Sequence, residues 1–140
     1  MNKVRAGFTL VELLVAILIL SIGLVGLAST MAAMTRWQML SASRAEMTLL
    51  ADGKLERLRA AGAVLSPDTA ELRIGGSVDT PADPHTDIVV GPSSRRFVLL
   101  WSVAAGPATT RDVRLRVRPE VDVPQTPAKL DFATLIALKQ

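Results

Sequence analysis

A run of 23 residues without a charged side chain, Leu13 to Thr35, lies near the start of this 140-residue chain. As an α-helix with a rise of about 1.5 Å per residue, the run would be roughly 34 Å long, enough to cross a hydrocarbon core of roughly 30 Å. About one hundred residues remain outside it, which is the size of one small domain. The sequence therefore predicts a small domain carried by a membrane helix and excludes a large multidomain enzyme.

The basic residues around this run predict its orientation. Lys3 and Arg5 precede the run, whereas Arg36 and Arg44 come only after it. By the positive-inside rule, we expect the N-terminus in the cytoplasm and the remainder outside. The formal net charge is +3, and without Lys3 and Arg5 the chain holds 14 basic against 13 acidic side chains. This near balance gives no reason to expect a nucleic-acid partner.

Residues that often build chemical sites are scarce. The chain has no cysteine and a single histidine, His85, which we expect in an exposed loop. Neither a disulfide framework nor a thiolate or zinc site is therefore predicted, and we expect no cofactor and no metal. The sequence has no nucleophile elbow, phosphate-binding loop or zinc-protease motif, so we do not expect an enzyme.

Two common alternatives for the apolar run are a removed signal peptide and a plain signal anchor. A signal-peptidase site could lie after Ala33, but the run exceeds the roughly 7 to 15 residues of a signal-peptide core. Glu12 is also unusual, because a carboxylate at the centre of a membrane helix costs on the order of 2.5 to 3.5 kcal/mol and less near an end. A generic anchor gives no reason for this carboxylate, whereas a cationic partner would.

The segment from Gly7 to Ala16, GFTLVELLVA, resembles the processing and methylation signal of type IV prepilins and type II secretion pseudopilins. The resemblance rests on a short basic leader ending in Gly7, the apolar Phe8, the carboxylate of Glu12 and the uninterrupted apolar helix. It implies that a prepilin peptidase cleaves between Gly7 and Phe8 and methylates the new amine of Phe8. It also implies that Glu12 pairs with this amine, in the same or a neighbouring subunit, during assembly.

Beyond the apolar run, hydrophobic residues recur at spacings of three and four, which predicts an amphipathic helix. Gly62 followed by Pro67 is read as its stop signal. The predicted organisation is a leader peptide at 1–7, a transmembrane and polymerisation helix at 8–35, its amphipathic continuation at 36–62, and a loop-rich segment with a β head at 63–140. The apolar stripe of the amphipathic part contains Trp37, Leu40, Met47, Leu50, Ala51, Leu55, Leu58 and Ala61.

The C-terminal part has strand patterns separated by turn residues. Between Gly62 and Ser94 we expect loops with one or two short strands, at Glu71–Ile74 and Asp87–Val90. Consecutive strands with short connections predict an antiparallel meander packed on the helix. The expected fold class is α+β, and the resemblance implies the type IV pilin fold. The three stronger strands are predicted at Arg95–Ala104, Asp112–Arg118 and Leu130–Leu138.

Three aspartates before the stronger strands could suggest a calcium loop. Asp79, Asp83 and Asp87 recur at a spacing of four, without the glycine-centred pattern of a calcium-binding loop. Turn formation and helix capping explain such aspartates more simply. The spacing of these aspartates alone does not decide whether they bind calcium.

A second charged cluster contains Arg114, Arg116 and Arg118, which alternate along one predicted strand and therefore share a face. Nearby in the sequence, it is joined by Arg95, Arg96 and Arg111. Phosphate contacts use such clusters, but the aromatic residues needed to stack bases are expected on the opposite, apolar face. We therefore expect a solvated outer face, partly paired with Asp112 and Glu120, and consider nucleic-acid binding unlikely.

The three strand segments, together with Ile19–Ala28, resemble the minor pilins of the priming complex, of the pilus modification type, and the corresponding minor pseudopilin. The implied partners are prepilin peptidase, other minor and major pilins or pseudopilins, the inner membrane and its assembly platform. The implied location is a single pass through the inner membrane with a periplasmic head, and then the pilus or pseudopilus. A signal-anchored extracytoplasmic binding domain is a second alternative.

Overall fold

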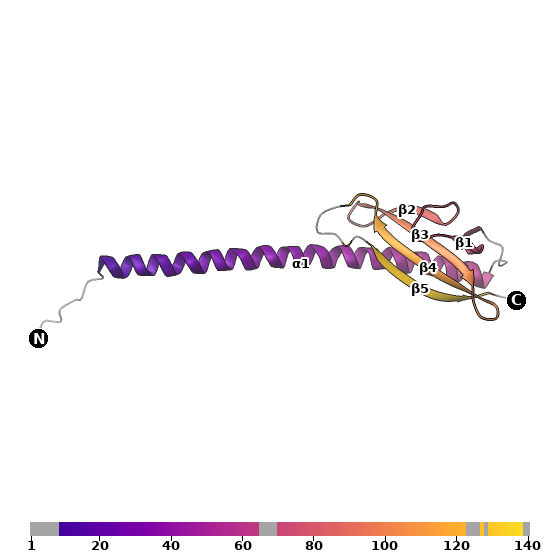
Figure 1. Ribbon diagram of the computed structural model, residues 1–140, viewed down its shortest axis with the longest axis horizontal. Helices are drawn as coiled ribbons and strands as arrows, with labels where there is room; N and C mark the ends of the chain where they lie inside the picture. Colours follow the sequence, from indigo (N-terminus) through magenta and orange to yellow (C-terminus); the bar gives the residue numbers. More distant parts are fainter. Residues whose placement is uncertain (1–8, 65–69, 123–126, 128, 139–140) are drawn as a thin grey trace, which may run out of the picture. The chain divides into compact units, whose positions relative to one another are not determined.

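The computed structural model describes residues 9–64, 70–122, 127 and 129–138. A long helix, α1 (Leu10–Val64), precedes a 3₁₀ turn (Ala70–Leu72) and the strands (Figure 1). The chain divides into two compact units, Met1–Gln38 and Met39–Gln140. The described strands are β1 (Gly75–Gly76), β2 (Thr86–Val90), β3 (Arg96–Ala105), β4 (Thr110–Pro119) and β5 (Leu130–Ala137).

The first unit contains the apolar part of α1. All its described residues are exposed, including large apolar side chains such as Leu10, Ile22 and Met34. By length and composition the helix can cross a membrane, and its most apolar part is not buried within the protein. A helix that is apolar on all sides requires an apolar surrounding, which a bilayer provides.

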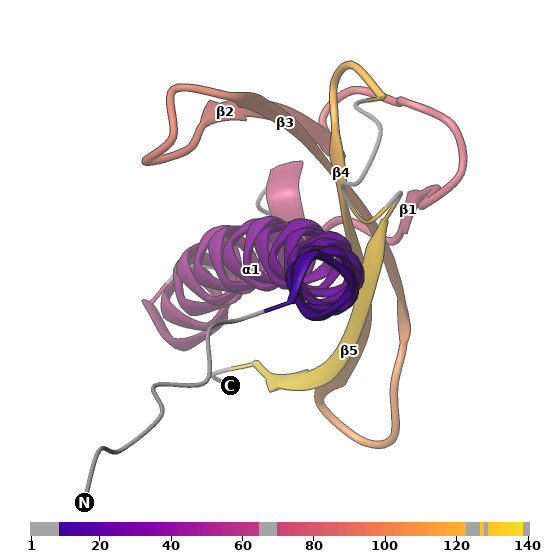
Figure 2. The ribbon, with the colours of Figure 1, turned by 90° about the vertical axis from the view of Figure 1, so that its left-hand side faces the viewer.

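The second unit is an antiparallel sheet packed on the C-terminal part of α1. Its strand order is β1-β3-β4-β5, and β2 pairs with the same side of β3 as β1. The long central pair aligns Phe97 with Pro119 at one end and Ala105 with Arg111 at the other. Figure 2 shows the sheet curving around α1, with β2 and β5 at its two edges. This arrangement confirms the predicted α+β, type IV pilin-like fold class.

The core forms where the helical stripe meets the alternating strand residues. Helix positions three and four apart and strand positions two apart each share a face, so the two patterns meet at one interface. Burying such a side chain stabilises the fold by roughly 1.5 to 3 kcal/mol. The buried core consists of Met47, Ala51, Leu55, Leu58, Leu72, Phe97, Leu99, Trp101, Val103, Val113, Leu115, Val117 and Ile136.

Two predictions at the ends of the core are wrong. Trp37 does not join the buried stripe and is 70% exposed in the first unit, because the head covers α1 only from about Ser43 onward. Glu71–Ile74 is not a strand. Leu72 enters the core from the 3₁₀ turn, and the indole Nε1 of Trp101 donates to the Glu71 carbonyl at 3.0 Å, so core contacts hold this segment.

The other strand predictions are confirmed with small shifts in their bounds. The segment predicted at Asp87–Val90 is β2, and the three stronger predictions correspond to β3, β4 and β5. Turn residues determine the boundaries. Ser94, with a φ of 61°, lies in the connection between β2 and β3, and Ala108, with a φ of 52°, lies between β3 and β4.

A carboxylate of α1 fixes the connection between β2 and β3. Glu46 accepts hydrogen bonds from the backbone N–H and the hydroxyl of Ser93, both at 2.8 Å. Gly91 makes this approach possible, because a Cβ at this position would overlap Glu46 and Phe97. We call this contact, formed by Glu46, Gly91 and Ser93, the helix–hairpin clip.

Gly62 does not stop α1, contrary to the sequence prediction. The helix continues to Val64, and Gly62 is buried where β5 crosses it. A Cβ at Gly62 would lie 2.8 Å from Ile136 Cγ2 and 3.0 Å from the carbonyl oxygen of Ala137. The glycine is therefore required by close packing. Pro67, the other half of the predicted stop signal, lies outside the described residues.

Alanine substitutions at two glycines of α1 should have opposite effects on stability. Gly62→Ala is expected to lower the free energy of unfolding of the head by about 1 to 3 kcal/mol, because β5 must shift. Gly53→Ala should raise it by about 0.5 to 1 kcal/mol, because a Cβ there meets no atom of the described residues within 4 Å and alanine favours the helix. Urea unfolding of the full chain in detergent micelles, followed by Trp101 emission in a Trp37→Phe background, measures both. Equal effects at the two positions would contradict the packing role of Gly62.

Candidate functional site

The expected processing site lies at the start of the chain, where the structure begins at Thr9. Lys3, Arg5, Gly7 and Phe8 therefore lie outside the described residues. Thr9 precedes the first residue of α1, and its hydroxyl accepts a hydrogen bond from the backbone N–H of Glu12 at 3.3 Å. Thr9 is thus the N-cap of α1.

Glu12 lies in the first turn of α1 and is exposed in the isolated chain. Thr9 and Glu12 have the spacing of a capping box, and a carboxylate in the first turn is favoured by the helix dipole. The sequence analysis missed the role of Thr9, although its position three residues before Glu12 is the recognisable signal. Glu12 therefore has a local role at the helix start in addition to any pairing with another group.

His85 is buried, contrary to the prediction of an exposed loop histidine. Only 4% of its surface is exposed, and its Nε2 lies 2.9 Å from the carbonyl oxygen of Arg73. Its ring packs against Trp101 with 5.7 Å between the ring centroids. The prediction is wrong because the loop folds back so that His85 lies beside the middle of β3, where Trp101 N–H donates to the His85 carbonyl at 3.2 Å.

Lys54 is a buried charge that the sequence analysis did not single out. Its Nζ lies 3.0 Å from Glu71 Oε1, 3.7 Å from Asp87 Oδ2 and 3.9 Å from the ring centroid of Trp101. Two carboxylates and an aromatic face compensate the cost of burying the ammonium group. The sequence did contain a sign of this buried lysine, because Lys54 interrupts the apolar stripe beside Leu55.

The three aspartates considered for calcium do not converge. Asp79 forms an ion pair with Arg116, whereas Asp87 faces Lys54. Asp83 forms no ion pair with another described residue. Within the described parts of the chain, no group of three or more metal-ligating side chains is close enough to hold an ion.

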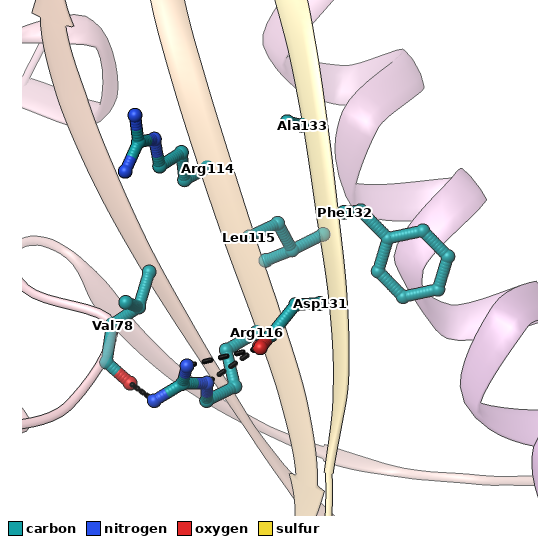
Figure 3. Close-up of a pocket in the computed structure, with 7 residues that line it drawn as sticks. All are labelled: Val78, Arg114, Leu115, Arg116, Asp131, Phe132 and Ala133. Carbon is teal, nitrogen blue, oxygen red and sulfur yellow. Dashed lines mark hydrogen bonds and ion pairs between the residues drawn. The ribbon is translucent and has the colours of Figure 1, made fainter.

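The face of β4 that carries the arginines is partly covered by other segments of the head. Only 14% of the Arg116 side chain is exposed. Arg116 donates to Asp131 on β5, to Asp79 and, at 3.2 Å, to the carbonyl oxygen of Val78. Figure 3 shows its guanidinium between Val78 and Asp131. These residues line a cavity of about 280 Å³, and Arg114 lines the same cavity. Arg116 therefore has a structural role. Its hydrogen bonds hold β5 and the segment that contains Val78 and Asp79 against β4.

The outer face also differs from the predicted solvated surface. Val98 and Leu100 are buried there, with Arg118 and Arg116 as their respective partners on β4. Long arginine stems cover apolar surface in this way while their charged ends reach polar groups. The predicted pairing with Glu120 is confirmed at Arg96 on β3. The predicted pairing with Asp112 is not found, because Asp112 forms no ion pair with another described residue.

The Arg116–Asp131 pair predicts a pH dependence of stability. Hydrogen bonds from Arg116 lower the pKa of Asp131 below its ordinary value of 3.8. Because the folded-state pKa is depressed, the pair stabilises the head above the unfolded-state pKa, and this stabilisation is lost as pH falls through the folded-state pKa. Asp131 is half exposed, so the contribution is below about 1 kcal/mol.

Asp131→Asn should therefore flatten the loss of stability below about pH 4 and lower stability at pH 7 by less than about 1 kcal/mol. The Trp101 urea assay between about pH 2 and pH 7 measures this change. Asp112→Asn, on the neighbouring strand, is the control, because Asp112 forms no ion pair with another described residue. A steeper acid response in Asp131→Asn than in the wild type would contradict the assignment.

Comparison with known proteins gives one family match. Residues 2–28 match the model of the prokaryotic N-terminal methylation motif, which includes Gly7, Phe8 and Glu12. No curated protein and no solved structure matches the chain. The motif, the exposed apolar helix and the α+β head together support a membrane-anchored, prepilin-like protein with a structural role.

Proposed function

We propose that this chain is a structural minor pilin of a type IV pilus. It is made as a prepilin, its leader is cleaved after Gly7, and the amine of Phe8 is methylated. Residues 8–35 then hold it in the inner membrane, with the N-terminus cytoplasmic and the head periplasmic. With other minor and major pilins and the assembly platform, it primes or joins the filament.

The observation that carries this proposal is the methylation motif at residues 2–28 on a helix whose apolar part is exposed, followed by an antiparallel head. The motif supports processing by prepilin peptidase. The exposed apolar surface from Leu10 onward supports insertion in a bilayer and packing against other helices. Lys3 and Arg5 support the orientation.

A minor pseudopilin of a type II secretion system is the alternative, because such a protein shares the processing signal and the fold. The two functions differ in their partners. Affinity purification of the processed chain from its native membrane should recover pilus components under the first proposal and secretion components under the second.

The test of processing is co-expression of the full chain with and without a prepilin peptidase, followed by intact mass and N-terminal sequencing. We expect a mature chain that starts at N-methylated Phe8 only when the peptidase is present. Gly7→Leu should abolish this product, because a bulky side chain then stands at the scissile bond. Gly26→Leu, the same substitution farther along the helix, should be processed normally. An unprocessed wild-type chain, or one cut near Ala33, would refute the proposal and leave a signal-anchored binding domain as the alternative.

A further inference from the structure

The outer edge of β2 has backbone groups that form no hydrogen bond with another described residue. Gly91 N–H donates to the Arg95 carbonyl at 2.8 Å, and Trp101 N–H donates to the His85 carbonyl at 3.2 Å. With the antiparallel register between them, odd-numbered residues of the β2 segment direct their backbone groups toward β3. The N–H and C=O groups of Thr86, Ile88 and Val90 therefore point away from the sheet.

This edge has little protection against pairing with another strand. The β2 sequence, TDIVV, contains neither proline nor lysine, and its one charged residue, Asp87, faces Lys54 beneath the sheet. Ile88 and Val90 are each more than half exposed. Edge strands usually avoid such a surface, because it can act as a template for an added strand.

A groove lies between this strand and α1. It has a volume of about 130 Å³ and a mixed lining, in which the apolar Leu49, Leu50 and Val89 lie next to charged side chains. Leu49 is 60% exposed, although it lies in the part of α1 that carries the head. We call this space, together with the outer edge of β2, the β2 groove. An exposed sheet edge with a neighbouring groove that takes alternate side chains is the geometry used by domains that bind extended peptides.

Gly53 indicates that something approaches α1 at this groove. It lines the groove in the middle of a helix, where glycine costs about 1 kcal/mol relative to alanine. Among the residues that the structure describes, none has an atom within 4 Å of a Cβ built at Gly53. Packing within the chain therefore does not explain this glycine, whereas a second chain running over the helix would.

The charges around the groove favour an acidic partner. Lys54 is compensated by Glu71 and Asp87. Arg57 also lines the groove and forms no ion pair with another described residue. A carboxylate on an incoming segment would complement this guanidinium.

We propose that the β2 groove binds an extended, apolar and acidic segment of a partner protein, which adds to β2 as an outer strand. Backbone groups of the segment bond to Ile88 and its neighbours at the edge. Alternate apolar side chains of the segment pack against Leu49, Leu50 and Val89, and a carboxylate faces Arg57. This inference concerns the head alone and does not depend on processing at Gly7.

The test measures binding of a fluorescent, capped peptide to the full-length chain in lipid nanodiscs. The peptide alternates valine and threonine around one central glutamate. Ile88→Pro removes an N–H that points away from β3, so the sheet stays paired, and should weaken binding at least about tenfold. Ile88→Val keeps that N–H and should bind within about twofold of the wild type. Gly53→Leu fills the groove and should also weaken binding at least about tenfold, whereas Gly26→Leu should not.

Peptide variants test the strand geometry without changing the protein. Only alternate N–H groups of an added strand face β2, so N-methylation of one alternate set should abolish binding and N-methylation of the other set should not. The two N-methylated peptides test the proposed strand pairing even if Ile88→Pro fails to fold. Circular dichroism and Trp101 emission show whether that variant folds. No saturable binding, no effect of both Ile88→Pro and Gly53→Leu, or equal effects of both N-methylated sets would overturn the proposal. A last outcome is that the wild-type chain binds no peptide but self-associates in sedimentation, and that Ile88→Pro abolishes this self-association. The edge of β2 would then bind a second copy of the chain, which would also overturn the proposal.

Discussion

Replacing Glu12 with glutamine should leave cleavage and methylation intact and reduce incorporation into filaments at least about tenfold. Under the proposed function, the carboxylate of Glu12 pairs with the methylated amine of Phe8 within an apolar environment. A hydrogen bond between charged groups contributes about 1.5 to 3 kcal/mol, which corresponds to roughly a 10- to 100-fold change in an equilibrium constant. Glutamine also occupies the capping-box position three residues after Thr9, so the substitution removes the charge while retaining the helix start.

The measurement compares the processed chain in sheared filaments with the processed chain in the membrane, by quantitative immunoblot. Asp52→Asn is the matched control, because Asp52 is an exposed carboxylate on the same helix and lies within the head unit. It should assemble as the wild type does. Equal incorporation of Glu12→Gln and the wild type would restrict Glu12 to its local role beside Thr9.

Trp101→Ala should destabilise the head by about 3 to 5 kcal/mol, a large part of the 5 to 15 kcal/mol typical of a domain. Trp101 is 1% exposed and is one of the largest side chains in the core. Its removal also leaves the ammonium of Lys54 without its aromatic face and His85 without its ring contact. The cavity and the loss of these contacts act in the same direction.

The control is Trp37→Ala, which removes the same side chain from a position that is 70% exposed. Its effect on unfolding of the head should be within about 0.5 kcal/mol. Urea unfolding of both full-length variants in micelles, followed by circular dichroism, gives the difference, and hydrogen exchange of the β3 and β4 amides locates it. A similar loss in both variants would show that Trp101 is not central to the head.

Local periodicity was sufficient to predict most of the fold. The spacing of Met47, Ala51, Leu55 and Leu58 identifies the buried face of α1, and the alternation in β3, β4 and β5 identifies the facing side of the sheet. These patterns depend on neighbours a few residues apart, so they can be read directly from the sequence. The methylation motif is similarly local, since the matched residues 2–28 form one continuous segment.

Features that depend on contacts between distant segments could not be predicted in the same way. The burial of His85 depends on its pairing with Trp101 in the middle of β3, and the packing of Gly62 depends on the path of β5. Lys54 was an interruption of an apolar stripe, but only the fold shows which carboxylates and which aromatic ring compensate it. The β2 groove likewise exists only once the strand and the helix are placed side by side.

The helix–hairpin clip has a mechanical consequence. A pull along the axis of α1 within the head would load the clip at Glu46 together with the core contacts from Met47 to Leu58, because all of them join the same helix to the sheet. Contacts that bear the same force at the same time must break together, which requires a large force. Contacts that bear the force one after another break in sequence at a lower force. The head is therefore expected to resist tension applied through its helix better than tension applied across the edge of β2.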